Sequence, residues 1–381
     1  MTRPLLIIAG EKSGENYGAA VVRRYAETHP GARFFGIGGT AMAEAGVEIV
    51  HSMSDLAVVG LAEVVSSLPR IRRIFADIRA EVAARKPAAA LLIDSPDFNL
   101  RLAKRLKALG VPVLYYISPT VWAWRPGRLA KVKAAVRKMC LIFPFEEKIY
   151  ADAGVPARFV GHPLLERVKA SFGRAGLVAK YGLDPNLPLV AVLPGSRRSE
   201  IRFHMPVLAE ALARIRERVP CQFAIIRAQD LDAGLVRDAL PAGGPPVALL
   251  DGDAYEAMAA ADLALSACGT ANLELALLGT PFVAFYRISR LTYALGHPFV
   301  RIDDYSIVNI LAGRRIAPEL VQKNFTAEAV AREAVRLLES PAARAEMRDR
   351  FLGIRESLGT ETASRNVAAE LAALAAGDAE V

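Results

Sequence analysis

The chain has 381 residues, of which 53% are hydrophobic and 23% are charged, a composition that excludes extended disorder and is typical of globular proteins. This length exceeds what one core ordinarily needs and predicts two domains. The formal net charge of +8 favours an anionic partner, which is nucleic acid, an acidic membrane surface or a phosphorylated substrate.

The sequence indicates a protein without a membrane-spanning helix. Its longest uncharged stretch, residues 108–124, is shorter than the roughly 18 residues that a spanning helix needs and contains two prolines. The three cysteines are far apart and odd in number, and the first residues lack a signal-peptide pattern. We therefore expect a reducing, cytoplasmic compartment.

The first half of the chain alternates short apolar runs with helix-like stretches, which predicts a parallel sheet covered on both faces. The first run, residues 5–8, leads into the glycine-rich sequence AGEKSGENYGAA, residues 9–20. Its glycines match neither a P-loop nor a dinucleotide fingerprint. We expect a turn there, followed by a helix over residues 18–28. The further predicted strands are 33–37, 89–93, 111–117 and 139–143.

Two carboxylates, Asp94 and Asp97, follow the predicted strand 89–93. In open parallel sheets ligands bind beyond the carboxyl ends of the strands, where a general base can reach the proton that it removes. Asp97 is the candidate base and Asp94 the alternative. Turn or N-cap roles are an open interpretation for both residues.

The next strand leads into YISPTVWAWRPGR, which holds both tryptophans of the chain. Trp122 and Trp124 alternate, so only one is expected to face a sheet interior while the other faces a loop or a ligand. Core packing and ligand contact are both open for this pair.

The same alternation restarts after Gly-His-Pro at 161–163 and the polar segment 174–188. We therefore expect an α/β protein with two doubly wound domains that face each other across a cleft, and a helical tail from residue 327. The predicted boundaries are 1–165, 166–350 and 351–381, with the last segment packing back on the first domain. The predicted strands of the second half are 189–193, 223–226, 247–250, 263–266 and 281–285.

A first phosphate-binding signal is VLPGSRRSE, directly after a predicted strand. Gly195 permits close backbone approach, and Ser196 and Arg197 offer a hydroxyl and a planar fork that matches a phosphate. A turn with a solvated arginine pair is the alternative.

A second signal is Cys268-Gly269-Thr270, between a predicted strand and a helix over about 271–278. A helix that begins at Gly269 and Thr270 directs free N–H groups and the positive end of its dipole towards a diphosphate. Glu274, one turn further, is a candidate for ribose hydroxyls. Capping by Thr270 is the alternative.

Metal binding is poorly supported, because the histidines and cysteines show no ligand spacing. Asp251-Gly252-Asp253 precedes a helix-like stretch, and we expect Asp253 to cap it. Two segments that mix apolar and basic residues, 56–75 and 285–302, together favour a peripheral membrane surface, with internal packing as the alternative.

Eight blocks follow one another along nearly the whole chain: AGEKSGE, IDSPDFN, SPTVWAWRPGR, FPFE, GHP, LPGSR, CGTANLE and SIVNILAGR. Their order and spacing closely resemble the lipid-A-disaccharide synthase family. The resemblance implies a GT-B fold of two Rossmann-like domains, the N-terminal one for the acceptor and the C-terminal one for the nucleotide sugar. It implies an inverting, metal-independent transferase without cofactors. The reaction joins UDP-2,3-diacylglucosamine to 2,3-diacylglucosamine 1-phosphate and yields the β-1,6-linked disaccharide and UDP.

The family pattern and the strand-end rule together assign residues to the two substrates. Asp97 is the expected base for the acceptor 6-hydroxyl. Glu15 stands where the family usually has Asp, which keeps the charge on a longer arm. The expected acceptor-side residues are Glu11, Ser13, Gly14, Glu15, Asp94, Asn99 and Trp122; the expected nucleotide-sugar residues are Gly195, Ser196, Arg197, Gly269, Thr270, Asn272, Glu274 and Asn309.

The resemblance also implies a place and partners. It predicts a protein on the cytoplasmic face of the inner membrane of Gram-negative bacteria, peripherally associated, with no nucleic-acid partner; a domain-swapped homodimer is known in the family. The rival readings are another UDP-sugar enzyme of the same fold, such as an epimerase or a peptidoglycan-lipid transferase, and a non-enzymatic nucleotide- or nucleic-acid-binding module.

Overall fold

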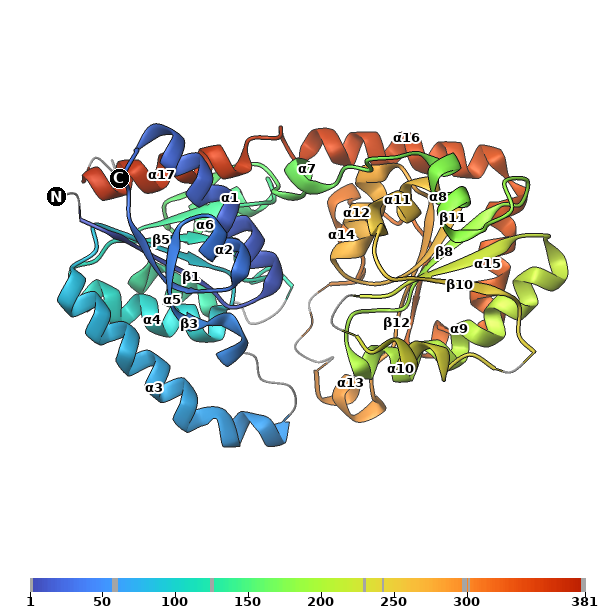
Figure 1. Ribbon diagram of the computed structural model, residues 1–381, viewed down its shortest axis with the longest axis horizontal. Coiled ribbons are helices and arrows are strands. Elements are labelled where there is room, and N and C mark those ends of the chain that lie inside the picture. Colours follow the sequence, from blue (N-terminus) through green and yellow to red (C-terminus); the bar gives the residue numbers. More distant parts are fainter. Residues whose placement is uncertain are drawn as a thin grey trace. The chain divides into compact units, whose positions relative to one another are not determined.

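The computed structural model describes residues 3–56, 61–123, 127–228, 231–241, 243–296, 300 and 302–377. The chain divides into two compact units, unit 1 formed by Met1–Pro163 with Leu358–Val381 and unit 2 formed by Leu164–Ser357 (Figure 1). Unit 2 is thus one continuous segment inserted into unit 1. Where the chain leaves and re-enters unit 1, His162 N donates a hydrogen bond of 3.0 Å to Leu358 O.

Unit 1 is built on a seven-stranded parallel sheet with the order β3-β2-β1-β4-β5-β6-β7. Its central strands are apolar and buried on both faces, as expected for a sheet with helices on each side. Because β1 and β4 are neighbours, the chain departs in opposite directions from this point, which makes it the topological switch point. The strands are β1 (Leu5–Ala9), β2 (Phe34–Gly38), β3 (Val47–Ser52), β4 (Ala90–Ile93), β5 (Val113–Tyr116), β6 (Lys138–Leu141) and β7 (Ala157–Phe159).

The helices of unit 1 include one from the far end of the sequence. The helix α17 packs against α1 and β5, and its Glu370 pairs with Lys138 at 2.8 Å and Arg158 at 2.7 Å, which lie on β6 and β7. The helices are α1 (Lys12–Thr28), α2 (Thr40–Glu44), α3 (Leu61–Arg85), α4 (Pro96–Ala108), α5 (Arg128–Ala135), α6 (Glu146–Asp152) and α17 (Ala363–Ala376).

Unit 2 repeats this arrangement with a six-stranded parallel sheet of order β10-β9-β8-β11-β12-β13. Its switch point lies between β8 and β11. The strands are β8 (Leu189–Leu193), β9 (Gln222–Ile226), β10 (Val247–Leu250), β11 (Leu263–Ala267), β12 (Phe282–Tyr286) and β13 (Glu319–Val321). The helices are α7 (Leu164–Arg167), α8 (Arg174–Tyr181), α9 (Arg198–Arg218), α10 (Ala233–Arg237), α11 (Ala254–Ala260), α12 (Thr270–Leu278), α13 (Arg290–Gly296), α14 (Ile307–Ala312), α15 (Ala327–Glu339) and α16 (Pro341–Ser357).

The two Rossmann-like units confirm the predicted fold class. The boundaries of the units differ from the predicted ones, because the predicted break after residue 350 falls inside α16. Phe351 and Ile354 of that helix are buried, and Phe351 stacks on Phe282 of β12 with ring centroids 5.6 Å apart. These apolar contacts hold all of α16 in unit 2. No helix in the described parts of the chain is long and apolar enough to cross a membrane.

Candidate active site

In unit 1, the segments that follow β1 and β4 converge at the switch point. The two strands pair with Ala9 opposite Ile93, so Gly10 and Asp94 leave the sheet side by side. A Cβ at Gly10 would lie 2.3 Å from the Oγ of Ser95, so only glycine permits this approach of the two segments. The structure therefore brings the glycine-rich segment and the acidic segment together.

The glycine-rich segment is helical earlier than predicted, since α1 begins at Lys12 and Glu11 is its N-cap residue. The prediction of a turn in this segment is therefore wrong, because most of the segment belongs to α1. Gly14 is buried, and a Cβ there would lie 3.3 Å from the Ile93 side chain. Glycine at this position serves helix packing on β4, while Glu11 and Ser13 remain exposed.

Glu15 is fully buried. Its Oε1 accepts a hydrogen bond of 2.8 Å from Ala41 N, in the first turn of α2, and its Oε2 pairs with Lys12 Nζ at 2.8 Å. A carboxylate is favourable at a helix N-terminus. In this structure the side chain is therefore engaged inside the fold, and a direct substrate contact stays a prediction.

The two candidate bases differ in environment. Burial and the neighbouring Glu11 carboxylate raise the pKa of Asp94 to about 6. The Asp97 side chain is 76% exposed and pairs at 2.9 Å with Arg128, which is 8% exposed. Asp94 thus carries a carboxyl poised near neutrality, whereas Asp97 presents a carboxylate to solvent and is oriented by a buried guanidinium.

The backbone at this corner is unusual. Asp94 and Ser95 both have positive φ, 46° and 45°, a conformation that costs non-glycine residues about 1–3 kcal/mol each and persists where surrounding contacts enforce it. Asn99, buried on α4, donates from Nδ2 to Ile93 O at 3.0 Å and Asp94 O at 2.8 Å. The Tyr115 hydroxyl donates to Asp94 O at 2.5 Å. Asn99 therefore fixes the corner that carries Asp94.

Trp122 connects two of the sequence blocks. Its Nε1 donates to Glu146 Oε1 at 3.2 Å, and its ring meets Phe145 edge to face at 5.3 Å. Glu146 is 1% exposed, and burial raises its pKa to about 7 against hydrogen bonds from Ser118, Trp122 and the backbone. Trp124 lies outside the described residues. Sequence reasoning missed the roles of Glu146 and Arg128, although both stand in blocks that follow adjacent strands.

In unit 2, the sequence after β8 forms an anion-binding loop, and the anion that it binds is a side chain of the same unit. Ser196 N and Arg197 N donate to Glu200 Oε2 at 2.8 Å and 3.2 Å, and Arg197 Nη1 lies 3.1 Å from Glu200 Oε1. Gly195 has φ +125°, and a Cβ there would lie 2.4 Å from that carboxylate. The Arg197 side chain is nevertheless 71% exposed. The glycine makes room for an anion, and here the anion is Glu200.

The neighbouring helix α12 begins at Thr270, with Gly269 as its N-cap residue and no capping hydrogen bond from a side chain. The alternative that Thr270 caps the helix is therefore wrong. Gly269 and Thr270 are exposed, and a Cβ at Gly269 would meet no atom within 4 Å. The first N–H groups of α12 thus stand at the switch point beside the β8 loop.

Two further predicted residues of unit 2, Asn272 and Glu274, make hydrogen bonds within that unit. Asn272 donates from Nδ2 to Ser266 Oγ at 2.9 Å and Ala267 O at 3.1 Å. Glu274 is half-buried and accepts a hydrogen bond of 3.0 Å from the Tyr255 hydroxyl; burial raises its pKa. Asn272 therefore acts on the end of β11 as Asn99 acts on the end of β4.

Asn309 lies on α14 and is fully buried. Its Oδ1 accepts from Ile316 N and Ala317 N, both at 3.0 Å. Its Nδ2 donates to Ala317 O at 3.0 Å and Glu319 Oε2 at 3.1 Å. These bonds use both amide hydrogens and both lone pairs, so Asn309 shapes the turn before β13 and has no polar capacity left for a ligand in this structure.

The prediction that Asp253 caps the helix that follows it is wrong. It occupies the N-cap position of α11, but its side chain makes no capping bond. It instead accepts hydrogen bonds from Lys180 and, at 2.9 Å, from Tyr181 Oη. Among the described residues no group of three or more His, Cys, Asp or Glu side chains is placed to hold a metal ion.

Comparisons with known proteins agree with this architecture. The family described as lipid-A-disaccharide synthetase matches residues 5–373. The lipid-A-disaccharide synthase of Geobacter sulfurreducens is 42% identical over 365 residues, which cover 96% of this chain and 95% of that one. The Myxococcus xanthus synthase is 41% identical over 373 residues, 97% of each chain.

Solved structures share the fold at low sequence identity. The UDP-GlcNAc 2-epimerase from Neisseria meningitidis, bound to UDP-GlcNAc, has a TM-score of 0.66 at 12% identity and covers 97% of this chain and 99% of its own. The calicheamicin glycosyltransferase CalG4 has a TM-score of 0.64 at 14% identity with full coverage of both chains. The sequence relatives, which span nearly the whole chain, go further than the fold: this chain belongs to the lipid-A-disaccharide synthase family.

Proposed function

We propose that the two switch points divide the family's reaction between them, unit 1 taking the acceptor and unit 2 the nucleotide sugar. As a member of this family the chain is a glycosyltransferase of lipid A biosynthesis, which condenses UDP-2,3-diacylglucosamine with 2,3-diacylglucosamine 1-phosphate. The products are the β-1,6-linked disaccharide 1-phosphate and UDP. The observation that carries the division is the difference in polar groups: unit 1 exposes the carboxylates of Glu11 and Asp97, whereas the loop of unit 2 directs N–H groups at an anion, here the Glu200 carboxylate.

The donor site that we propose in unit 2 consists of Gly195, Ser196 and Arg197 with the N-terminus of α12. Its N–H groups already hold a carboxylate, so a diphosphate oxygen that displaces Glu200 finds the same donors. The exposed Arg197 guanidinium, which pairs with Glu200 at 3.1 Å, would exchange that carboxylate for the diphosphate. Because these groups supply fixed positive charge where the leaving UDP develops negative charge, we propose that the transfer needs no metal ion.

The acceptor site that we propose in unit 1 contains Glu11, Ser13 and the two aspartates. The acceptor 6-hydroxyl attacks the anomeric carbon, the bond to UDP breaks, and the configuration inverts. A carboxylate must take the hydroxyl proton. Asp97 is the proposed base, because it is exposed and oriented by Arg128. Asp94 is the alternative, with a pKa of about 6 that suits a base near neutrality.

The setting of the reaction is also a proposal. Both substrates carry acyl chains, which supports peripheral association with the cytoplasmic face of the inner membrane. Segment 56–75, which we expect to contribute, falls partly outside the described residues. A domain-swapped homodimer stays a prediction; the placement of α17 in unit 1, after α16 in unit 2, makes it the element that such a dimer would exchange.

The test is to mix the purified chain with both acylated sugars in detergent and to measure UDP and disaccharide. We expect both products in equal amounts. An epimerase would alter the UDP-sugar without an acceptor. A binding module would release no UDP, and its affinity would fall steeply with salt. The absence of disaccharide, with UDP-sugar binding intact, would overturn the assignment.

A further inference from the structure

His204 is a buried, titratable side chain of unit 2 that the proposed reaction does not use. It lies in the second turn of α9 and is 0% exposed. That helix starts directly after the loop Gly195–Arg197, which we propose as the binding site for the diphosphate. Because buried polar groups ordinarily have hydrogen-bond partners, the partners of this ring indicate its role.

The two ring nitrogens of His204 bond to two different segments. Nδ1 lies 2.7 Å from Pro194 O, and since a carbonyl oxygen can only accept, Nδ1 carries the hydrogen. In the neutral ring Nε2 is then an acceptor, and it accepts a hydrogen bond of 3.0 Å from Arg287 N. The neutral ring thus uses one nitrogen for each segment.

The two segments follow strands that are not neighbours. Pro194 comes directly after β8, and Arg287 comes directly after β12. Both strands pair with β11, one on either side of it. The His204 ring therefore connects two strand ends that the sheet itself joins only through a third strand.

Aromatic rings hold the imidazole in this orientation. Phe285 and Phe325 meet it edge to face, with ring centroids 5.2 Å and 5.7 Å away, and these two rings stack on each other at 4.7 Å. Burial lowers the pKa of His204, which favours the neutral ring that accepts from Arg287 N. Hydrogen bonds in such a desolvated setting are stronger than those at the surface.

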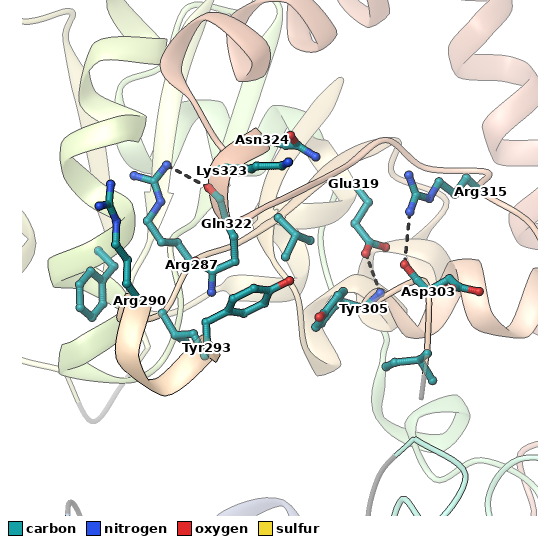
Figure 2. Close-up of a pocket in the computed structure, with 14 residues that line it drawn as sticks. Arg287, Arg290, Tyr293, Asp303, Tyr305, Arg315, Glu319, Gln322, Lys323 and Asn324 are labelled. Carbon is teal, nitrogen blue, oxygen red and sulfur yellow. Dashed lines mark hydrogen bonds between the residues drawn. The ribbon is translucent and has the colours of Figure 1, made fainter. Parts of the chain in front are cut away.

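The Arg287 side chain extends the connection to a cavity of about 850 Å³, which it lines together with Phe203 of α9. Its Nη2 donates to Gln322 O at 3.2 Å and to Phe325 O, and Figure 2 shows the guanidinium directed at Gln322. The guanidinium also lies 5.0 Å from the centroid of the Phe325 ring. These partners are uncharged, so they fix the position of the guanidinium without neutralising it.

We propose that His204 is a positioning residue of the nucleotide-sugar site, because its ring holds the Gly195–Arg197 loop and the Arg287 guanidinium in a fixed relation to each other. The inference rests on the proposed function, since it takes the loop as the diphosphate site and extends that site to Arg287. His204 acts through these two segments and does not touch the substrate. Groups that are in place before binding cost less to order and stabilise developing charge without reorganisation.

The test removes the two bonds of the ring separately. In His204→Asn the amide nitrogen takes the place of Nδ1 and keeps a donor for Pro194 O. In His204→Gln the longer side chain brings an amide oxygen to the place of Nε2 and keeps an acceptor for Arg287 N. His204→Ala keeps neither bond. The control is Leu208→Ala, one turn further along α9, which removes a buried apolar side chain and lowers stability without touching this connection.

UDP affinity, measured by calorimetry on the full chain where urea unfolding shows each variant to be folded, reports on the loop. We expect UDP to bind about tenfold more weakly to His204→Ala and His204→Gln, and within about twofold of the wild type to His204→Asn and Leu208→Ala. A merely structural role would not separate Asn from Gln, and that comparison stands even if His204→Ala does not fold. Equal UDP affinities in the Asn and Gln variants, or as large a loss in Leu208→Ala as in His204→Ala, would overturn the proposal.

Turnover reports on the Arg287 side. A double-mutant cycle combines Arg287→Gln with His204→Asn, which lacks the acceptor for Arg287 N, and measures kcat/KM for UDP-2,3-diacylglucosamine. We expect each single variant to lower kcat/KM about tenfold, and the double variant to lie within about twofold of Arg287→Gln, because His204 then has no guanidinium to position. Losses that multiply would overturn the coupling between the two residues and with it the proposal.

Arg197→Gln distinguishes this proposal from the one on which it rests. If Arg197→Gln weakens UDP binding and His204→Ala binds UDP no more weakly than Leu208→Ala, the positioning role alone is overturned. If UDP affinity is unchanged in Arg197→Gln, the diphosphate site itself is overturned, and the role of His204 with it.

Discussion

The switch points of units 1 and 2 carry different polar groups, although the two sheets share one strand order through six strands. In unit 1, Glu11, Asp94 and Asp97 stand after the first and fourth strands. In unit 2, the equivalent positions hold Arg197 and the uncapped start of α12. The same scaffold thus presents acids at one place and anion-binding groups at the other.

What the two units share is the way the corner is held. In each, a buried asparagine on the helix after the fourth strand, Asn99 or Asn272, donates its amide hydrogens to the end of that strand. In each unit, the side-chain oxygen Oδ1 of that asparagine is buried without a hydrogen-bond partner among the described residues. The support of the corner is therefore common to both units, and we infer that the loop residues determine the chemistry.

The largest effect is expected from removing the proposed base of unit 1. We expect Asp97→Asn to lower turnover by about 10²–10⁴-fold, because a general base contributes about that much, and to leave UDP affinity unchanged. The measurement is initial UDP release together with UDP binding by calorimetry.

Asp94→Asn is the matched variant for that experiment. If Asp97 is the base, Asp94→Asn has the smaller effect on turnover. A near-normal rate for Asp97→Asn with collapse for Asp94→Asn would assign the proton transfer to Asp94.

The corresponding change in unit 2 is Arg197→Gln. It removes a charge from the proposed diphosphate site, and we expect turnover to fall about 10²-fold with weaker UDP binding. Arg202→Gln, on the same helix and exposed, serves as the control. Loss of turnover with unchanged UDP affinity in Arg197→Gln would place the diphosphate elsewhere.

The buried Glu146 of unit 1 makes the free energy of unfolding depend on pH. Burial raises the pKa of Glu146 from its ordinary value near 4.5 to about 7. The folded protein therefore binds this proton more tightly than the unfolded chain, so its contribution to the free energy of unfolding falls as pH rises through this window. We expect Glu146→Gln to remove this fall, by up to about 3 kcal/mol, in urea unfolding between pH 5 and pH 8. Parallel pH profiles for the wild type and the variant would contradict the assignment.

The smallest effect concerns the approach of the two segments in unit 1. Gly10→Ala places a Cβ 2.3 Å from Ser95 Oγ, and we expect a loss of about 2 kcal/mol in the free energy of unfolding. Ser95→Gly removes the obstructing atoms and should restore most of it. Gly173→Ala, with no atom within 4 Å of the added Cβ, is the control, and an equal loss there would argue against the close approach.

The sequence predicted the central strands and the edge strand β10, which is the apolar run 247–250, and missed the other three edge strands. Strands such as β1 and β8 are short apolar runs buried throughout, which a pattern can reveal. The edge strands β3, β7 and β13 were not predicted, because they are only partly buried and lack a continuous apolar run. The early start of α1 was missed because its glycines, which pack on Ile93, look like a turn in the sequence.

In the candidate site, too, some features were predictable from the sequence and others were not. Strand-end position located the segments at Gly10, Asp94, Gly195 and Gly269, because parallel strands deliver their ends to one edge. The partners of those segments were not predictable, since Arg128 lies 31 residues from Asp97 and Glu146 lies 24 residues from Trp122. The role of Glu200 was predictable, because a glutamate three residues after the N-cap residue, here Arg197, is a known capping pattern.

The insertion of unit 2 into unit 1 has a practical consequence. Unit 2 is encoded by one uninterrupted stretch, 164–357, and the two ends that it leaves in unit 1 are already bridged by the 3.0 Å bond from His162 N to Leu358 O. A gene that fuses residue 163 to residue 358 through a short linker therefore closes unit 1 upon itself, and the excised stretch needs no splicing. Under the proposed division of the substrates, each unit then becomes a separate reagent that can be titrated with the substrate assigned to it.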